Sequence, residues 1–230
     1  MSTRFIYKAK RLADIGNLPT AAGIGFFNGQ FWGNTNGVVS PLGGSPFGNT
    51  LLVDGDNGSD TDTRLPYKTV QAAVTASSQG GTIYVKPLEA ESASGDTDPD
   101  SYAETITIPA GKDGLSIIGV SRGLTQGGQP QIKIGAGATA MFTVQAFGVR
   151  ISNLTINGAG STGGGILLDA TAGTADAGGL VVDNCHFKNC KGAASSQTAG
   201  AIYWSAQGAS WYATIANNDF FDCRIGILLL

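Results

Sequence analysis

The sequence predicts an all-β solenoid, and three observations carry this prediction. One pattern recurs three times between residues 149 and 230: an apolar residue, a polar one, an asparagine, two further residues and an apolar one. Its asparagines, Asn153, Asn184 and Asn217, lie 31 and 33 residues apart, and a fixed period of this length is typical of solenoids. Glycine, with 35 of 230 residues, is about twice as frequent as usual, which suits strands joined by tight turns. A second motif, a glycine followed by apolar residues, alternates with the first, at Gly165–Leu168, Gly200–Trp204 and Gly226–Leu229.

Composition and charge exclude several classes of function. The formal net charge is −3, so the sequence predicts neither a nucleic-acid partner nor attraction to an anionic membrane. No apolar run approaches the roughly 20 residues that span a bilayer, so membrane insertion is not expected. No apolar segment typical of a signal peptide follows the basic residues near the N-terminus. The three cysteines lack metal-site spacing, so reduced thiols are expected, and neither a cofactor nor a metal is predicted.

Residues 1–49 differ from the rest of the chain and are predicted to form an irregular N-terminal arm. Glycine and asparagine dominate there, and four large aromatic residues, Phe26, Phe27, Phe31 and Trp32, follow no clear period. Such a segment cannot easily bury these side chains by itself, so we expect them to pack on another surface. Two interpretations remain open: the arm docks on a partner, or it is a flexible leader that covers the end of the core.

A short strand at Leu51–Val53 opens the second region and is followed by an acidic turn at Asp54–Asp60. The turn superficially resembles the start of a calcium loop. Counted from Asp54, however, positions 5, 6 and 12 hold Gly58, Ser59 and Leu65, whereas an EF-hand needs a ligand, a glycine and a glutamate there. A solvated turn is therefore predicted.

The best helix candidate spans residues 66–76. Val70, Ala73 and Val74 lie at i, i+3 and i+4 and form a narrow apolar stripe, while Gly80-Gly81 follows as a terminator. Alternation then predicts a strand at Thr82–Val85.

Three stretches of this region resemble one known superfamily. They are Val53-Asp-Gly55, the run from Pro66 to Ala73 and the run from Gly81 to Pro87. Together they resemble the opening segment of right-handed parallel β-helix proteins of the pectate-lyase-like superfamily, in which a short helix caps the open end of the solenoid. The resemblance covers about residues 51–230 and implies an all-β fold. That fold is a right-handed, single-stranded parallel β-helix over residues 50–230, with a short N-terminal capping α-helix. It implies no single activity, because the superfamily includes lyases, hydrolases, phage tailspikes and non-enzymatic adhesins.

The middle of the chain is predicted to hold an acidic insertion followed by short strands. Residues 88–101 are interpreted as a solvated loop, with a cation site as the alternative. The strands are expected at Glu104–Ile108, Leu115–Gly119, Gln131–Ile134, Met141–Val144 and Val149–Ile151.

The repeat predicts which side chains face inward and which form the corners. Strands alternate sides with period 2, so Ile156, Phe187 and Phe220 are expected to stack in one column inside the coil. Asn153, Asn184 and Asn217 are expected to stack at a corner as a structural ladder. Asparagine tolerates left-handed backbone there, and its amide can satisfy backbone groups.

Two other features of the repeat receive structural interpretations. The only histidine, His186, is expected to point outward between Thr155 and Asp219, as a surface residue with no nucleophile pattern around it. Cys190 and Cys223 occupy equivalent positions of adjacent coils and are expected to form a stacked pair of thiols rather than a disulfide.

The second motif predicts an apolar exterior column. If the isoleucines of that motif face inward, then Leu167, Tyr203 and Leu228 face outward, and an apolar exterior face suggests a cover. That cover is either the chain's own loops or a sister subunit, as in trimeric tailspikes. Trp211 and Tyr212 lie near this face and are candidates for subunit or glycan contact, because aromatic rings stack on sugars.

The catalytic residues stay unknown. Glycosidases and lyases need paired carboxylates, or a carboxylate with a cation and a base. The repeat contains Asp169, Asp183, Asp219 and Asp222, but no two of them are expected in one column of adjacent coils.

These features favour a virion component that resembles a phage tailspike or tail fibre. Residues 1–49 would bind other virion proteins, and a homotrimeric β-helix would face host surface polysaccharide, with or without depolymerase activity. Such a protein is made in the host cytoplasm without a signal peptide. Two alternatives stay open: a free polysaccharide lyase or glycoside hydrolase, and a non-catalytic capsid or tail decoration protein. Because the last motif begins another coil, the natural chain is expected to continue past Leu230.

Overall fold

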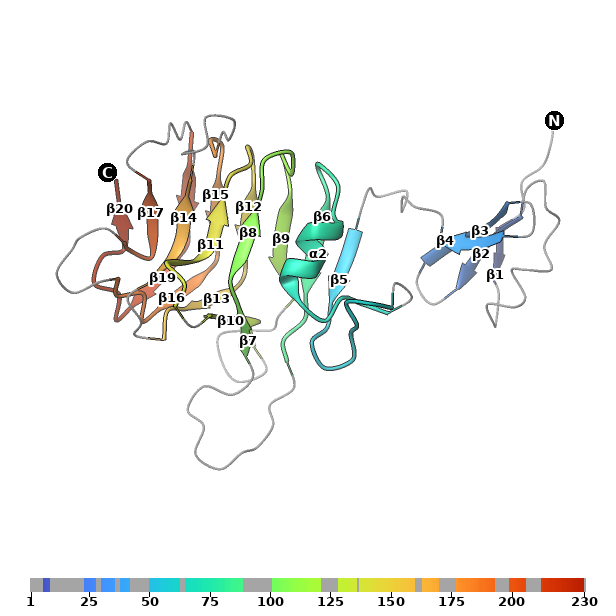
Figure 1. Ribbon diagram of the computed structural model, residues 1–230, viewed down its shortest axis with the longest axis horizontal. Helices are drawn as coiled ribbons and strands as arrows, with labels where there is room; N and C mark the ends of the chain where they lie inside the picture. Colours follow the sequence, from blue (N-terminus) through green and yellow to red (C-terminus); the bar gives the residue numbers. More distant parts are fainter. Residues whose placement is uncertain are drawn as a thin grey trace, which may run out of the picture. The chain divides into compact units, whose positions relative to one another are not determined.

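A computed structural model shows the described residues as strands with one short helix (Figure 1). For residues 1–49 it describes the backbone of four strands only. It describes residues 6–8, 23–27, 30–35, 38–41, 50–62, 65–88, 101–120, 128–135, 137–159, 163–169, 177–192, 199–205 and 212–229. The chain divides into two compact units, Met1–Asn49 and Thr50–Leu230. In the described residues, no helix is long and apolar enough to cross a bilayer.

The first unit contains a small sheet that sequence patterning did not predict. Strand β1 pairs parallel to β2, and β2, β3 and β4 pair antiparallel in chain order. Their bounds are Ile6–Lys8, Gly23–Phe27, Gln30–Thr35 and Val38–Pro41. The missed signal is two Asn-Gly pairs, Asn28-Gly29 between β2 and β3 and Asn36-Gly37 between β3 and β4, since Asn-Gly is the preferred two-residue hairpin connection.

The second unit is a solenoid of three parallel sheets, and from β6 onward each turn of the chain adds one strand to each sheet. The β5–β18 sheet contains β5 (Thr50–Val53), β6 (Thr82–Val85), β9 (Ser116–Gly119), β12 (Arg150–Ser152), β15 (Val181–Asp183) and β18 (Thr214–Ala216). The β7–β19 sheet contains β7 (Ser101–Glu104), β10 (Gln131–Ile134), β13 (Thr155–Asn157), β16 (His186–Lys188) and β19 (Asp219–Phe221). The β8–β20 sheet contains β8 (Ile106–Ile108), β11 (Ala140–Val144), β14 (Gly164–Leu168), β17 (Ile202–Trp204) and β20 (Ile227–Leu228). The predicted all-β parallel β-helix with a short capping helix is confirmed.

The single strand predicted over Glu104–Ile108 is wrong. The structure has two strands there, because Glu104 ends β7 and Ile106 begins β8 in a different sheet. The corner between them contains only Thr105 and lacks the glycine, asparagine or proline that usually marks a turn. The sequence pattern therefore gives no sign of a corner at Thr105.

Helix α2 (Val70–Ala76) covers the end of the solenoid where the first strands lie (Figure 1). The Thr69 side chain accepts a hydrogen bond from the Ala72 amide at 3.2 Å and so caps the helix N-terminus. The predicted apolar stripe of Val70, Ala73 and Val74 is fully buried. This stripe packs on β5 to β8 and closes the apolar interior at that end.

The predicted inward column is confirmed by the strand register. Ile156 pairs with Phe187, and Phe187 pairs with Phe220. Ile156 and Phe187 are fully buried, while Phe220, in the last coil, is 40% exposed. The two phenyl rings stack with centroids 5.1 Å apart and planes 11° from parallel. Aromatic stacking of this kind adds specificity to the apolar burial that holds adjacent coils together.

Candidate functional site

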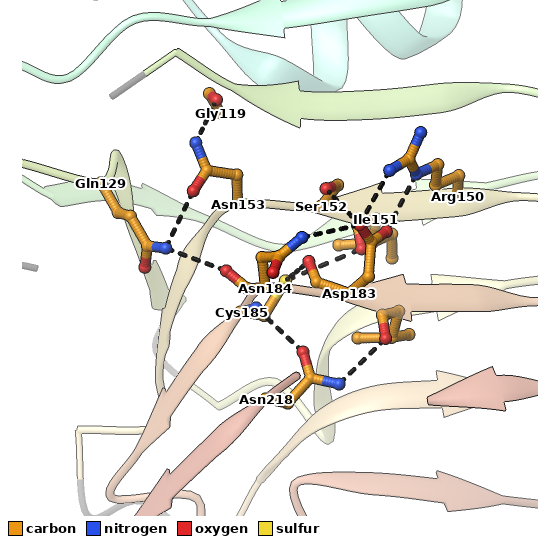
Figure 2. A network of polar contacts seen from close by, with 11 residues as sticks. Gly119, Gln129, Arg150, Ile151, Ser152, Asn153, Asp183, Asn184, Cys185 and Asn218 are labelled. Carbon is orange, nitrogen blue, oxygen red and sulfur yellow. Dashed lines mark hydrogen bonds and ion pairs between the residues drawn. The ribbon is translucent and has the colours of Figure 1, made fainter. Parts of the chain in front are cut away.

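The corner between the β5–β18 and β7–β19 sheets carries a polar network at the position where the repeat predicts a structural asparagine ladder (Figure 2). Asn153, Asn184 and Asn217 follow β12, β15 and β18 and have φ of 58°, 55° and 55°. These values lie in the left-handed region, which asparagine enters more easily than most residues. All three therefore turn the chain in the same way, in successive coils.

The backbone of this corner forms the repeating part of the network. The Asn153 amide donates to the Asp183 carbonyl at 3.1 Å, and the Asn184 amide donates to the Ala216 carbonyl at 3.2 Å. Each corner is thus hydrogen-bonded to the next coil at the residue where the chain changes sheet. This pattern continues the ladders of the flanking strands around the turn.

The side-chain amides at this corner differ from one coil to the next. Asn153 Nδ2 donates to the Gly119 carbonyl at 2.7 Å, whereas Asn184 Nδ2 donates to Asp183 Oδ2 at 2.9 Å. Gln129 Nε2 donates both to Asn153 Oδ1 at 3.0 Å and to the Asn184 carbonyl at 2.9 Å. Figure 2 shows Gln129 reaching the corner from one side. Gln129 was missed from the sequence because it lies outside the repeat.

Asn218 is a second amide that the sequence did not single out. It takes the position equivalent to the inward-facing Cys185, and its side chain bridges to the preceding coil. Asn218 Oδ1 accepts from the Cys185 amide at 2.9 Å, and Asn218 Nδ2 donates to the Val182 carbonyl at 2.9 Å. The sequence signal for this role of Asn218 is a polar residue at an inward-facing position, because such a side chain needs a hydrogen-bond partner.

Asp183 is the most heavily bonded carboxylate of the site. Arg150 binds it in a bidentate manner, with Nε 2.9 Å from Oδ1 and Nη2 2.8 Å from Oδ2. Ser152 Oγ donates to Oδ2 at 3.1 Å, and Asn184 adds the bond described above. These bonds hold the pKa of Asp183 below its usual range, and the bond from Arg150 has the largest effect. Burial has the opposite effect but is outweighed. A carboxylate stabilised as an anion by four donors is poorly suited to general acid or base catalysis.

Several other acids of the described solenoid also bind backbone amides, a side-chain amide or a neighbouring cation. Both oxygens of Glu104 accept from α2, Oε1 from the Val70 amide at 3.0 Å and Oε2 from the Gln71 amide at 2.9 Å. Burial nevertheless raises the pKa of Glu104. Asp169 accepts from Gln145 at 3.1 Å, and Asp222 pairs with Lys191 at 2.9 Å.

The acidic turn after β5 is folded on itself. Asp54 Oδ1 accepts from the Asp56 and Asn57 amides, both at 3.2 Å, and Oδ2 lies 3.2 Å from Lys86 Nζ. Burial tends to raise the pKa of Asp54, but these bonds outweigh it and lower the pKa. The predicted solvated turn is thus only partly correct, because Asp54 itself is 9% exposed.

Metal binding finds no support among the residues that the structure describes. They contain no group of three or more His, Cys, Asp or Glu side chains that could hold a metal ion. Most of the acidic insertion, residues 89–100, lies outside the described ranges.

The exterior column of the β8–β20 sheet has the predicted register, since Leu167 pairs with Tyr203 and Tyr203 with Leu228. Tyr203 is only 5% exposed. Its hydroxyl donates to the Thr139 carbonyl at 2.9 Å, and its ring lies so close to Gly164 that an added Cβ there would be 2.3 Å from a ring carbon. The chain itself therefore supplies much of the cover over Tyr203, while Leu167 and Leu228 stay partly exposed.

Of the other residues predicted to contact a subunit, a glycan or the particle, the structure describes only some side chains. Tyr212 is 86% exposed, with φ of 62°. Trp211 lies outside the described residues. Phe26, Phe27, Phe31 and Trp32 lie on β2 and β3, with Phe26 opposite Phe31, but their side chains are outside the described part of the structure.

His186 lies between Thr155 and Asp219 on the exterior of the β7–β19 sheet, as predicted. It is partly buried, and its Nδ1 atom is buried without a hydrogen bond. Gln131 pairs with Thr155 one strand further along. Polar residues thus follow one another in register on consecutive strands of this sheet.

No protein-family model, curated protein or solved structure matches the chain. The class of this protein is therefore defined by its fold, which in the described part of the chain is a parallel β-solenoid with a short helix at one end.

Proposed function

We propose that the chain is a virion attachment protein of the phage tailspike or tail-fibre type. Residues 1–49 bind the particle, and the solenoid faces host surface polysaccharide as part of a homotrimer. The observation that carries this proposal is the two-unit organisation, with a small sheet in Met1–Asn49 and a solenoid in Thr50–Leu230. An anchor and a display domain need this separation. A free enzyme has no evident use for the first unit.

The structural roles of two described carboxylates, Asp183 and Glu104, favour binding over catalysis. Asp183 is saturated with donors, and Glu104 caps a helix. Neither is free to move a proton to or from a sugar, so these acids support the fold rather than a depolymerase reaction.

The exterior of the β7–β19 sheet is the proposed glycan face. His186 and Asp219 lie in register on consecutive strands and offer an imidazole and a carboxylate, next to Thr155, which is 8% exposed and whose hydroxyl donates to Gln129 Oε1 at 3.3 Å. Strands in a sheet are about 4.8 Å apart, so these groups recur at short, even intervals along the solenoid. Such a row suits a linear polymer of sugars better than one compact ligand.

The first experiment tests glycan binding with the full chain. Immobilised protein is exposed to a panel of bacterial capsular and O-antigen polysaccharides, and binding is followed by biolayer interferometry. We expect saturable binding to at least one polymer, weakened at least tenfold by Asp219→Ala. Thr82→Ala, on the β5–β18 sheet, is the matched control and should bind normally. Absence of binding across the panel would contradict the glycan role.

Two further measurements separate the alternatives. Multi-angle light scattering should give the mass of a trimer, and a stable monomer would contradict the homotrimer. Release of reducing ends or unsaturated products from a bound polymer would instead identify a polysaccharide hydrolase or lyase. Detection of the chain in purified particles by mass spectrometry tests the virion location, and absence from particles would refute it.

A further inference from the structure

Cys190 and Cys223 lie at a second corner of the solenoid, where the chain leaves the β7–β19 sheet. Lys188 pairs with Phe221, and the Asn189 amide donates to the Phe221 carbonyl at 3.1 Å. Cys190 follows Asn189, and Cys223 follows Asp222, so the two cysteines occupy equivalent positions of adjacent coils. Lys191 follows Cys190, and Asp222 precedes Cys223. Lys191 Nζ lies 2.9 Å from Asp222 Oδ2, and this ion pair ties the same two coils together again.

The two sulfur atoms are oriented alike, each towards the preceding coil. Cys190 Sγ lies 3.7 Å from the Ile156 carbonyl oxygen, and Cys223 Sγ lies 3.7 Å from the Phe187 carbonyl oxygen. Phe187 belongs to the coil that carries Cys190, so the Cys223 sulfur faces that coil. Adjacent strands lie about 4.8 Å apart, which is within the Cα separation of about 4.4–6.8 Å found in disulfides. Both cysteines are free thiols in this structure.

The environment gives the two thiols different reactivities. The hydrogen bond between them lowers the pKa of Cys223 to about 7, and the same bond together with burial raises the pKa of Cys190. Cys223 is partly exposed, whereas Cys190 is fully buried. Cys223 is thus the thiol that an external reagent can reach, and its lowered pKa favours the reactive thiolate.

We propose that Cys190 and Cys223 are an oxidisable pair that forms a disulfide between adjacent coils on contact with a small disulfide oxidant. The Cys223 thiolate attacks one sulfur of the oxidant, forms a mixed disulfide and releases one small thiolate, which takes up a proton. Cys190 then loses its proton to solvent and attacks the Cys223 sulfur. The second small thiolate leaves and is protonated. Two cysteines are oxidised, and one small disulfide is reduced to two thiols.

The third cysteine provides an internal reference. Cys185 is 2% exposed, and burial raises its pKa to about 12. Its sulfur lies 3.7 Å from the Ile151 carbonyl and 3.5 Å from the Asp183 carbonyl, at the first corner. It should therefore stay reduced while the other two react.

The test uses the full native chain and oxidised glutathione at neutral pH. After quenching with iodoacetamide, we expect two of the three thiols to be lost. The intact mass of an unalkylated sample should fall by two hydrogen atoms, and peptide mapping of the quenched sample should show a Cys190–Cys223 link. Three intact thiols, a lasting glutathione adduct on Cys223, a link to Cys185 or a link between chains would each overturn the proposal.

Two variants separate the roles of the thiols without depending on the wild-type result. Cys190→Ser retains a hydroxyl donor to Cys223 but cannot form the second bond, so the reaction should stop at the mixed disulfide. Cys190→Ala also removes the donor and should slow adduct formation by about tenfold, because the Cys223 pKa returns towards its ordinary value. Equal rates in the two variants would contradict the activation of Cys223. Circular dichroism confirms that each variant is folded before it is compared.

Discussion

Replacement of Asn153 by alanine and by glycine tests whether the corner requires a left-handed residue. At ordinary strand positions, glycine is less stable than alanine by about 0.5–1 kcal/mol, because it loses more chain entropy on folding. At Asn153, with φ of 58°, we expect the opposite order. A left-handed residue with a Cβ costs about 1–2 kcal/mol, which exceeds the entropic advantage of alanine.

The size of each effect follows from the bonds of the Asn153 side chain. Both variants lose the bond to the Gly119 carbonyl at 2.7 Å and the bond from Gln129 at 3.0 Å, at about 1 kcal/mol each. Alanine adds the backbone strain. We therefore expect Asn153→Ala to lower the free energy of unfolding by about 3 kcal/mol, and Asn153→Gly to lower it by about 0.5–1 kcal/mol less.

The measurement is urea unfolding of the full chain, followed by circular dichroism and by tryptophan fluorescence so that coincidence of the two curves can be checked. Ala103→Gly is the control for the ordinary order. Ala103 is an exposed strand residue of β7 outside the left-handed region, and glycine should destabilise it by about 0.5–1 kcal/mol. If Asn153→Ala is as stable as Asn153→Gly, the backbone at the corner is not what selects asparagine.

Four further substitutions test the core and the charged groups. Phe187→Ala, at a fully buried ring, should cost about 3–5 kcal/mol in urea unfolding, and Phe220→Ala should cost clearly less, because Phe220 is 40% exposed. Asp183→Asn should cost about 1 kcal/mol at neutral pH, a value that allows for screening of the half-exposed Arg150. The folded pKa of Asp183 is lowered, so its stabilisation is present above the unfolded value near 3.9 and is lost as pH falls through the folded pKa. A cost that persists below about pH 2 would contradict this linkage. The folded pKa of Glu104 is raised, so its titration favours the folded state below the unfolded value and loses that effect as pH rises through the folded pKa. Unfolding measured at pH 4 and pH 7 should therefore show Glu104→Gln to be more costly at the lower pH, and the reverse order would refute the assignment.

The fold could be predicted because apolar residues recur at a fixed spacing that only a regular solenoid explains. Ile156 and Phe187 are apolar at a fixed offset from an asparagine, and only a coil of constant length places both inside. The split between β7 and β8 could not be predicted in the same way, since Thr105 carries no turn signal. The sheet in residues 1–49 was missed for a different reason, because its signal lies in the Asn-Gly pairs and not in an apolar period.

The site was predicted less completely than the fold. The backbone role of Asn153, Asn184 and Asn217 follows from residue type, because few residues accept a positive φ. Their side-chain partners depend on groups far away in the chain. Gln129 lies 24 residues before Asn153, and no local pattern connects the two.

The corners and the exterior faces of the solenoid therefore carry different kinds of polar residue. At a corner, a backbone group leaves its strand ladder and must find another partner, so Asn153, Gln129 and Asn218 are committed to the fold. On a sheet face the ladder already satisfies the backbone, so side chains such as His186 and Asp219 are not needed for that purpose. A substitution at a corner should change stability first and binding only through it. A substitution on the β7–β19 face should change binding with little effect on unfolding, and this difference allows scaffold and recognition to be separated in a protein whose fold alone assigns no activity.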